Sequence, residues 1–228
     1  AALTIVVAKI STTHSLALSA ATPTYGSVDT ITATASAPGT VAFKSSGTDI
    51  PGCESVATTL TAPHTAACPW IPTSVASYSL TAVLTPTDTA AYATATATAL
   101  TPTSVRSPLT ITPTPGQTKI FGTLNPTLTY SITSGALVLS DELTGALTYT
   151  GSDAGSYAIT LGTLTNANNP KYAITLASES FTVTKAVQSA VSLSSLSAAF
   201  SPSNKTVSLT GSGGTGTGTY QYALDNSN

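Results

Sequence analysis

Regular alternation of apolar and polar residues between Lys119 and Leu176 constrains the fold of this chain more than any other feature. Apolar residues occupy every second position in four short runs. These runs are separated by turn residues, such as Gly135 and those of segment 151–155. A period of two puts one face of an extended strand against a core and the other in water. Four strands are therefore predicted, with no helix longer than a short piece over 139–145. The residues predicted to face the core are Leu128, Tyr130, Ile132, Leu147, Tyr149, Tyr157, Ile159, Leu161, Tyr172, Ile174 and Leu176.

The composition also favours strands. Only 7% of the 228 residues are charged, against about 25% in ordinary globular proteins. Threonine makes up about a fifth of the chain, and threonine-rich sequence with little Lys and Glu favours strands over helices. Much of the hydrophobic content is alanine, so the aromatic residues must supply much of the bulk of each core. The expected fold class is therefore all-β.

The first part of the chain, residues 10–106, has a different pattern of short runs. Seven strand-like runs follow one another at intervals typical of an immunoglobulin-like sandwich. The predicted strands are residues 15–19, 29–36, 39–45, 54–61, 64–70, 77–85 and 92–100.

Motifs in this first part carry a resemblance to a known family. They are Thr24-Tyr25-Gly26, the run from Gly39 to Phe43, the run from Tyr78 to Val83, and the later Asp88 and Tyr92. On these residues the segment resembles the bacterial Ig-like repeats of large surface proteins. It departs from many such repeats at residues 85–90, where a Gly-Asp turn is usual, and this departure concerns the shape of one loop.

A second set of motifs lies further along. These are Lys-x-Phe-Gly at 119–122, Asn-Pro at 125–126, Gly-x-Asp-x-Gly-x-Tyr at 151–157, and a late Tyr172. On these residues the stretch of roughly 108–185 resembles the MBG domain of bacterial surface proteins, which more often has Tyr-Gly where this chain has Phe-Gly. Because most of these positions are turn residues, the resemblance implies a fold rather than an activity.

The expected organisation is a series of tandem β units. Residues 1–9 are a terminal strand, either of a preceding repeat or of the first domain. Residues 10–106 are the Ig-like sandwich, residues 107–185 the MBG-like domain, and residues 186–228 the start of a further β repeat. In that last segment strands are expected near 189–194, 205–210 and 219–225, and the glycine-rich run 211–218 is interpreted as a hairpin turn, since it lacks the Lys-Ser/Thr of a phosphate-binding loop.

Cys53 and Cys68 are the only cysteines. Strand-like sequence flanks both, so a disulfide between neighbouring strands is predicted, which implies an oxidising, extracellular location. A metal site is disfavoured, because His64 would be the nearest further ligand and no CxxC spacing is present.

No pattern of catalytic or cofactor-binding residues is found. The two histidines, His14 and His64, lie outside any nucleophile elbow, and the sparse carboxylates Asp141, Glu142 and Asp153 are too few for a calcium loop. Asp153 is therefore interpreted as a turn residue. The seven basic residues are scattered, which argues against nucleic-acid binding, and no apolar run is long enough to span a membrane. Trp70 is interpreted as core packing around the disulfide, with stacking on a sugar as the alternative.

These observations favour a structural role without catalysis, cofactor or metal. The first hypothesis is a stalk or fibre module of an extracellular, adhesin-like bacterial surface protein. The alternatives are a self-assembling subunit of an extracellular filament or surface layer, a carbohydrate-binding accessory module, and a phage decoration domain. The corresponding partners are neighbouring repeats, identical subunits joined end to end, and glycans of a host or a surface.

The two ends of the chain suggest how such assembly would work. Leu3, Ile5 and Val7 share one face of a predicted terminal strand, and an unpaired apolar strand invites association. The incomplete repeat over 186–228 is expected to have too few strands to cover its apolar side chains. Pairing of the two ends would give the terminal strand a partner and the repeat a further strand. The alternative is that the strand belongs to the first Ig-like unit.

Overall fold

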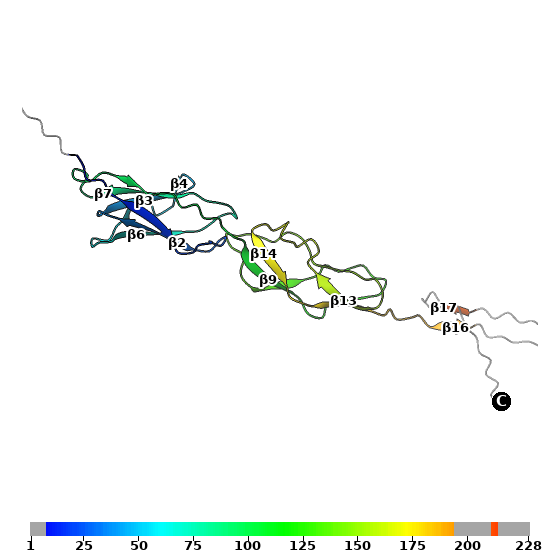
Figure 1. Cartoon of the computed structure of the whole chain (residues 1–228). Helices are drawn as coiled ribbons and strands as arrows, with labels where there is room; N and C mark the ends of the chain where they lie inside the picture. The colour runs from blue at the N-terminus through cyan, green and yellow to red at the C-terminus, as the bar shows by residue number, and fades with distance from the viewer. Residues whose placement is uncertain (1–7, 194–210, 214–228) are drawn as a thin grey trace, which may run out of the picture.

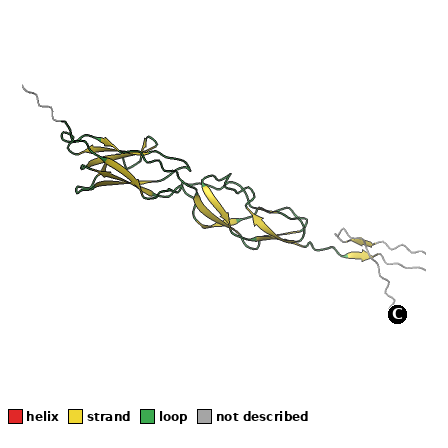
Figure 2. Cartoon of the chain, viewed as in Figure 1, coloured by secondary structure: helices red, strands yellow, loops and turns green. Residues whose placement is uncertain are grey.

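The computed structural model describes residues 8–193 and 211–213 of the chain. Every regular element among these residues is a strand (Figure 2), so the all-β fold class is confirmed. Two β bodies follow one another end to end, and the chain continues beyond the second body to β16 (Figure 1). No helix among the described residues is long and apolar enough to cross a membrane.

The first body is a sandwich of two antiparallel sheets. One sheet has the order β1-β2-β6 and the other the order β4-β3-β7-β8, with β5 also paired to β3. Alternate side chains of both sheets point between them, and the core contains Ile31, Val41, Phe43, Leu80 and Leu84. The bounds are β1 His14–Leu18, β2 Asp29–Ala35, β3 Gly39–Ser45, β4 Thr48–Asp49, β5 Val56–Ala57, β6 His64–Trp70, β7 Leu80–Pro86 and β8 Ala95–Thr96.

All seven strands predicted for this part are present, with two differences. The predicted strands over 54–61 and 92–100 are reduced to the two-residue strands β5 and β8, and β4 was not predicted. The runs in question are rich in Ala and Thr, whose small side chains alternate in polarity but cover little core. Alternation alone is therefore a weaker guide to strand length there than in β2 or β3.

A disulfide joins the two sheets of the first sandwich. Cys68 lies in β6, while Cys53 follows β4 and its carbonyl accepts a hydrogen bond from the Phe43 amide of β3. Both cysteines are buried in the same core as Trp70, which has an exposed fraction of 4%. The interpretation of Trp70 as a core residue beside the disulfide is therefore confirmed.

The second body is also built from two sheets. One has the order β11-β9-β14 and the other the order β10-β15-β13-β12, and each contains one parallel pair, β9 with β14 and β10 with β15. The bounds are β9 Ser107–Pro113, β10 Thr118–Ile120, β11 Tyr130–Ser134, β12 Thr148–Tyr149, β13 Gly155–Thr160, β14 Tyr172–Leu176 and β15 Ser180–Thr184.

The four strands predicted from the alternation between Lys119 and Leu176 are β11, β12, β13 and β14. All the apolar residues assigned to their inner face belong to one core cluster or pack against it, so the predicted face is correct. The short helical piece expected over 139–145 is wrong. Leu139 and Ser140 have φ values of 53° and 62°, a left-handed conformation that cannot continue a helix.

After β15 the structure describes one further strand pair. β16 (Val191–Leu193) pairs antiparallel with β17 (Gly211–Gly213). The prediction that the glycine-rich run is a hairpin turn is therefore wrong for its first three residues, which form a strand. The sequence does not indicate this strand, because glycine can pair through its backbone without a side chain that would show alternation. The strands predicted near 205–210 and 219–225, and the predicted assembly strand with Leu3, Ile5 and Val7, lie outside the described residues.

The core of the second sandwich allows a direct test of the assigned faces. Ile159→Ala removes a buried side chain from β13 and is expected to lower the free energy of unfolding by about 2–4 kcal/mol. The control is Ser156→Ala, at an exposed position of the same strand. Chemical unfolding followed by circular dichroism measures both, and equal effects of the two substitutions would show that the face is misassigned.

Candidate functional site

The most unusual residue in the structure is Tyr25, which belongs to the first sandwich by sequence and to the second by packing. It lies in the turn after β1, where its amide donates a hydrogen bond of 2.9 Å to the Val105 carbonyl at the end of the first sandwich. Its side chain has an exposed fraction of 1% and is part of the core cluster that contains Leu109, Ile111 and Phe181 of the second sandwich. A tyrosine of one unit therefore completes the core of the next.

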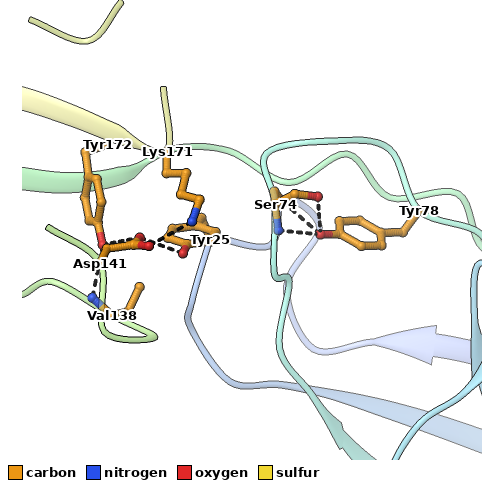
Figure 3. A network of polar contacts seen from close by, with 7 residues as sticks. All are labelled: Tyr25, Ser74, Tyr78, Val138, Asp141, Lys171 and Tyr172. Carbon is orange, nitrogen blue, oxygen red and sulfur yellow. Dashed lines mark hydrogen bonds and ion pairs between the residues drawn. The ribbon is translucent and has the colours of Figure 1, made fainter. Parts of the chain in front are cut away.

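The hydroxyl group of Tyr25 finds its partner in the second sandwich. It donates a hydrogen bond of 2.7 Å to Asp141 Oδ2, and Tyr172 donates one of 2.9 Å to the same oxygen (Figure 3). Lys171 Nζ lies 2.8 Å from the other oxygen, Oδ1. We call these four residues the junction cluster. Because its carboxylate is paired and hydrogen-bonded on both oxygens, the cost of burying the charge is offset.

Aromatic and cationic contacts reinforce the junction cluster. The Tyr25 and Tyr172 rings meet edge to face, with centroids 5.8 Å apart and an interplanar angle of 86°, the geometry that the ring quadrupoles favour. The Lys171 ammonium group lies 5.1 Å from the centroid of the Tyr25 ring, within the range of a cation–π interaction. Tyr25 is thus held through both its ring and its hydroxyl group.

The segment before Asp141 has a backbone that aims its carboxylate at the junction. The left-handed residues Leu139 and Ser140 form a tight turn, in which the Asp141 amide donates to the Val138 carbonyl at 3.0 Å. The Val138 amide in turn donates to the Tyr172 hydroxyl group at 3.0 Å. Left-handed non-glycine residues are costly and concentrate at sites that the surrounding structure holds in place, and here they position the acceptor of Tyr25.

Glycine and the linker bring the two sandwiches close together. Gly26 has φ of +73°, and a Cβ atom at this position would lie 2.2 Å from a methyl group of Val138. Any side chain there would have to displace Val138 of the second sandwich. Across the same junction, Arg106 Nε donates a hydrogen bond of 3.0 Å to the Pro170 carbonyl, and β9 begins at the very next residue.

The environment of the junction cluster shifts its ionisation. Burial alone would raise the pKa of Asp141, but the hydrogen bonds from Lys171, Tyr25 and Tyr172 hold that pKa below its usual value. The hydrogen bond to Asp141 raises the pKa of Lys171 above its ordinary range. Burial, together with the neighbouring carboxylate, raises the pKa of Tyr25. The charged carboxylate, the ammonium group and the neutral phenols are therefore the forms that coexist here, an arrangement suited to holding two units together.

The other residues singled out from the sequence lie away from the junction or have structural roles. Asp153 is a turn residue as predicted, and its carbonyl accepts a hydrogen bond of 2.8 Å from the Tyr157 hydroxyl group. In the described part of the chain no cluster of three His, Cys, Asp or Glu residues could hold a metal ion. His14 and His64 flank Ala35 on opposite neighbouring strands, and neither is hydrogen-bonded to a carboxylate there.

A hollow of about 570 Å³ lies on the first sandwich beside Trp70. Tyr78 and Ile50 also line it, together with Asp49 and Ser45. The Tyr78 ring packs perpendicular to the Trp70 indole, with centroids 5.0 Å apart, and the Tyr78 hydroxyl group is hydrogen-bonded to Ser74 (Figure 3). Because the indole is almost fully buried, it does not offer the exposed aromatic platform on which a sugar would stack.

The sequence named every member of the junction cluster but did not bring them together. Tyr25 was named only within a family motif, Asp141 only among carboxylates too few for a calcium loop, and Lys171 was counted only as one of the seven scattered basic residues. Only Tyr172 was assigned correctly to a core. The available signal was the recurrence of an aromatic-Gly pair, Tyr25-Gly26 and Phe121-Gly122, near the start of both sandwiches.

Comparison with protein families supports the sequence interpretation of the second sandwich. Residues 109–182 match the family described as MBG domain (YGX type), which confirms the resemblance inferred from the motifs. One solved structure, of the fibronectin(III)-like modules of Clostridium thermocellum CbhA, is 16% identical and covers 75% of this chain and 94% of that chain, with a TM-score of 0.26. A score this low does not establish a shared fold. The comparison with curated proteins found no match.

Tyr25→Phe tests the contribution of the hydroxyl group separately from that of the ring. Loss of a hydrogen bond to a charged acceptor is expected to destabilise the second sandwich by about 1.5–3 kcal/mol. The matched control is Tyr78→Phe, because the Tyr78 hydroxyl group bonds only within the first sandwich, to Ser74. In chemical unfolding, circular dichroism reports both sandwiches and Trp70 fluorescence reports the first, so the transition seen only by circular dichroism belongs to the second. Equal destabilisation of the second sandwich by both substitutions would contradict the assignment.

The lowered pKa of Asp141 predicts a dependence on acid. A carboxyl group whose pKa is lower in the folded state stabilises that state above its unfolded pKa, about 3.9 for Asp, and loses this contribution as the pH falls through the folded value. The stability difference between the wild type and Asp141→Asn is therefore expected to be constant near neutral pH and to shrink below about pH 4. Unfolding curves over an acid pH series measure it, and a difference that does not change with pH would refute the shift.

Proposed function

We propose that this chain is a non-catalytic spacer segment of an extracellular bacterial surface protein, in which consecutive β-sandwiches are held in a fixed end-to-end orientation. The observation that carries the proposal is the burial of Tyr25 in the core of the following sandwich, with its hydroxyl group bonded to Asp141. A flexible linker would need none of these contacts. A stalk that must project a distant site away from a surface needs its units to resist bending.

Other observations support the cellular setting. The disulfide between Cys53 and Cys68 is of the kind that persists in oxidising compartments. The low content of charged residues and the match of residues 109–182 to the MBG domain agree with a repetitive surface protein. An adhesin-like role, with the recognition site carried by another part of the protein, is the specific form of the proposal.

The remaining alternatives differ in what favours them. A carbohydrate-binding role would need an aromatic platform, and the burial of Trp70 counts against its serving as one. The self-assembling filament depends on the end segments of the chain, so it remains a separate proposal to be tested by deleting residues 1–9. Persistence of assembly after that deletion would exclude pairing through Leu3, Ile5 and Val7.

Small-angle X-ray scattering tests the proposed rigid orientation. The wild-type chain is expected to give a pair-distance distribution that a single end-to-end arrangement of the two sandwiches explains. Asp141→Ala removes the acceptor of Tyr25, so a wider distribution of inter-sandwich angles is expected. The control is Asp49→Ala, which breaks the exposed Lys44–Asp49 ion pair of 2.8 Å within the first sandwich. A wild-type chain that already samples many angles would overturn the proposal.

A further inference from the structure

The turn that carries Tyr25 has a counterpart in the second sandwich. Its central pair is Phe121-Gly122, which directly follows β10. The corresponding pair in the first sandwich, Tyr25-Gly26, directly follows Thr24, which forms an isolated β-bridge. Gly122 has φ of +84° and Gly26 φ of +73°. Each turn is closed by a hydrogen bond from the amide after the glycine to the carbonyl before the aromatic residue. The Ser27 amide donates to the Thr24 carbonyl at 3.0 Å, and the Thr123 amide donates to the Ile120 carbonyl at 3.1 Å.

Each turn is also hydrogen-bonded in the same way to the segment with which its own sandwich ends. Thr24 pairs in parallel with Val105, and the Tyr25 amide donates to the Val105 carbonyl at 2.9 Å. Ile120 pairs in parallel with Thr184, and the Phe121 amide donates to the Thr184 carbonyl at 2.8 Å. In both sandwiches the aromatic residue is therefore bonded to the segment from which the chain continues to the following unit.

The residues that follow Val105 and Thr184 also correspond. A basic residue comes next in both cases, Arg106 after Val105 and Lys185 after Thr184. At the first junction Arg106 bonds to a carbonyl of the next sandwich, at Pro170. After Arg106 the strand β9 begins at once, whereas residues 186–190 connect Lys185 to β16.

Exposure is where the two turns differ. Tyr25 has an exposed fraction of 1%, because the second sandwich covers it, whereas Phe121 has one of 47%. The residues three positions later are exposed in both turns, Val28 at 62% and Leu124 at 94%. Ile120, which directly precedes Phe121, has an exposed fraction of 52%, and Val187, two residues after Lys185, has one of 93%.

We propose that Phe121 acts as Tyr25 does and inserts into the β unit that begins after Lys185 in the same chain. We call an aromatic residue that joins two units in this way a plug. The occupant is assigned by continuity, since that unit starts from the strand end to which the Phe121 amide is bonded. Gly122 would allow the close approach that Gly26 allows at the first junction. This inference rests on the proposed stalk function and extends it from one junction to a repeated device.

The chemistry of the two plugs predicts different sockets. Tyr25 carries a hydroxyl group and is met by the carboxylate of Asp141. The Phe121 side chain has no polar atom, so its docking requires no hydrogen-bond acceptor from the partner. Phe121→Tyr would bury an unpaired hydroxyl group, and it should therefore weaken docking, although tyrosine is the residue used at the first junction.

Hydroxyl-radical footprinting of the full 228-residue chain tests the docking directly, since mass spectrometry reports each residue separately. Reactivities are normalised to the intrinsic reactivity of each residue type. Docking predicts that Phe121 is protected as Tyr25 is, while Leu124 stays reactive as Val28 does. The proposal is overturned if Phe121 is as reactive as expected for a side chain with an exposed fraction of 47%, while Leu124 is also reactive.

A pair of variants in the full chain provides the second measurement. Phe121→Ser is expected to speed amide hydrogen exchange in residues 186–193, whereas the control Leu124→Ser, in the same turn, should not. Neither side chain belongs to the buried core, so the second sandwich should remain folded in both variants. Identical exchange in the two variants would reject the plug, and a loss of self-association in Phe121→Ser alone would reject the assigned occupant in favour of a second copy.

The outcomes also separate this inference from the proposed function. A protected Phe121 with a flexible first junction would contradict the stalk while retaining the second plug. A rigid first junction with an unprotected Phe121 would retain the stalk and reject the repeated device.

Discussion

The hydrogen bond from Tyr25 to the partly buried carboxylate of Asp141 is the interaction on which the arrangement of the two sandwiches depends. A charge removed from water is tolerated only when it is paired and hydrogen-bonded, and one of its partners, Tyr25, comes from the neighbouring unit. Separating the sandwiches would expose the tyrosine ring and remove a donor from the carboxylate at the same time. The cost of bending at this junction therefore combines apolar and electrostatic contributions.

Local backbone features prepare this junction before the side chains meet. The left-handed residues Leu139 and Ser140 present Asp141, and Gly26 lets the turn of Tyr25 approach Val138 closely. The turn at Leu139 and Ser140 also serves the second sandwich itself, where Asp141 is bonded to Tyr172 and Lys171, whereas the close approach of Gly26 to Val138 is a contact between the two units. Together with a linker as short as Arg106, they bring two domains with thin cores and few charges into direct contact.

Much of the fold was accessible from the sequence because it depends on local periodicity. Alternation assigned the strands of the second sandwich and their buried face, including Ile159 and Ile174, and the resemblance to the MBG domain was confirmed. The errors fell where periodicity carries no information. Residues 139–145 are a left-handed turn rather than a short helix, and Gly211–Gly213 is a strand although it has no side chains to alternate.

By itself, the sequence determined that this protein is all-β, which faces of its strands are buried, and where turns must occur, since these follow from the spacing of residue types along the chain. Only the tertiary structure decided that Tyr25 leaves its own sandwich and meets Asp141, which lies far along the sequence. The physical reason is that a hydrogen bond between two units depends on the relative placement of two finished sandwiches, and no pattern within either one encodes that placement.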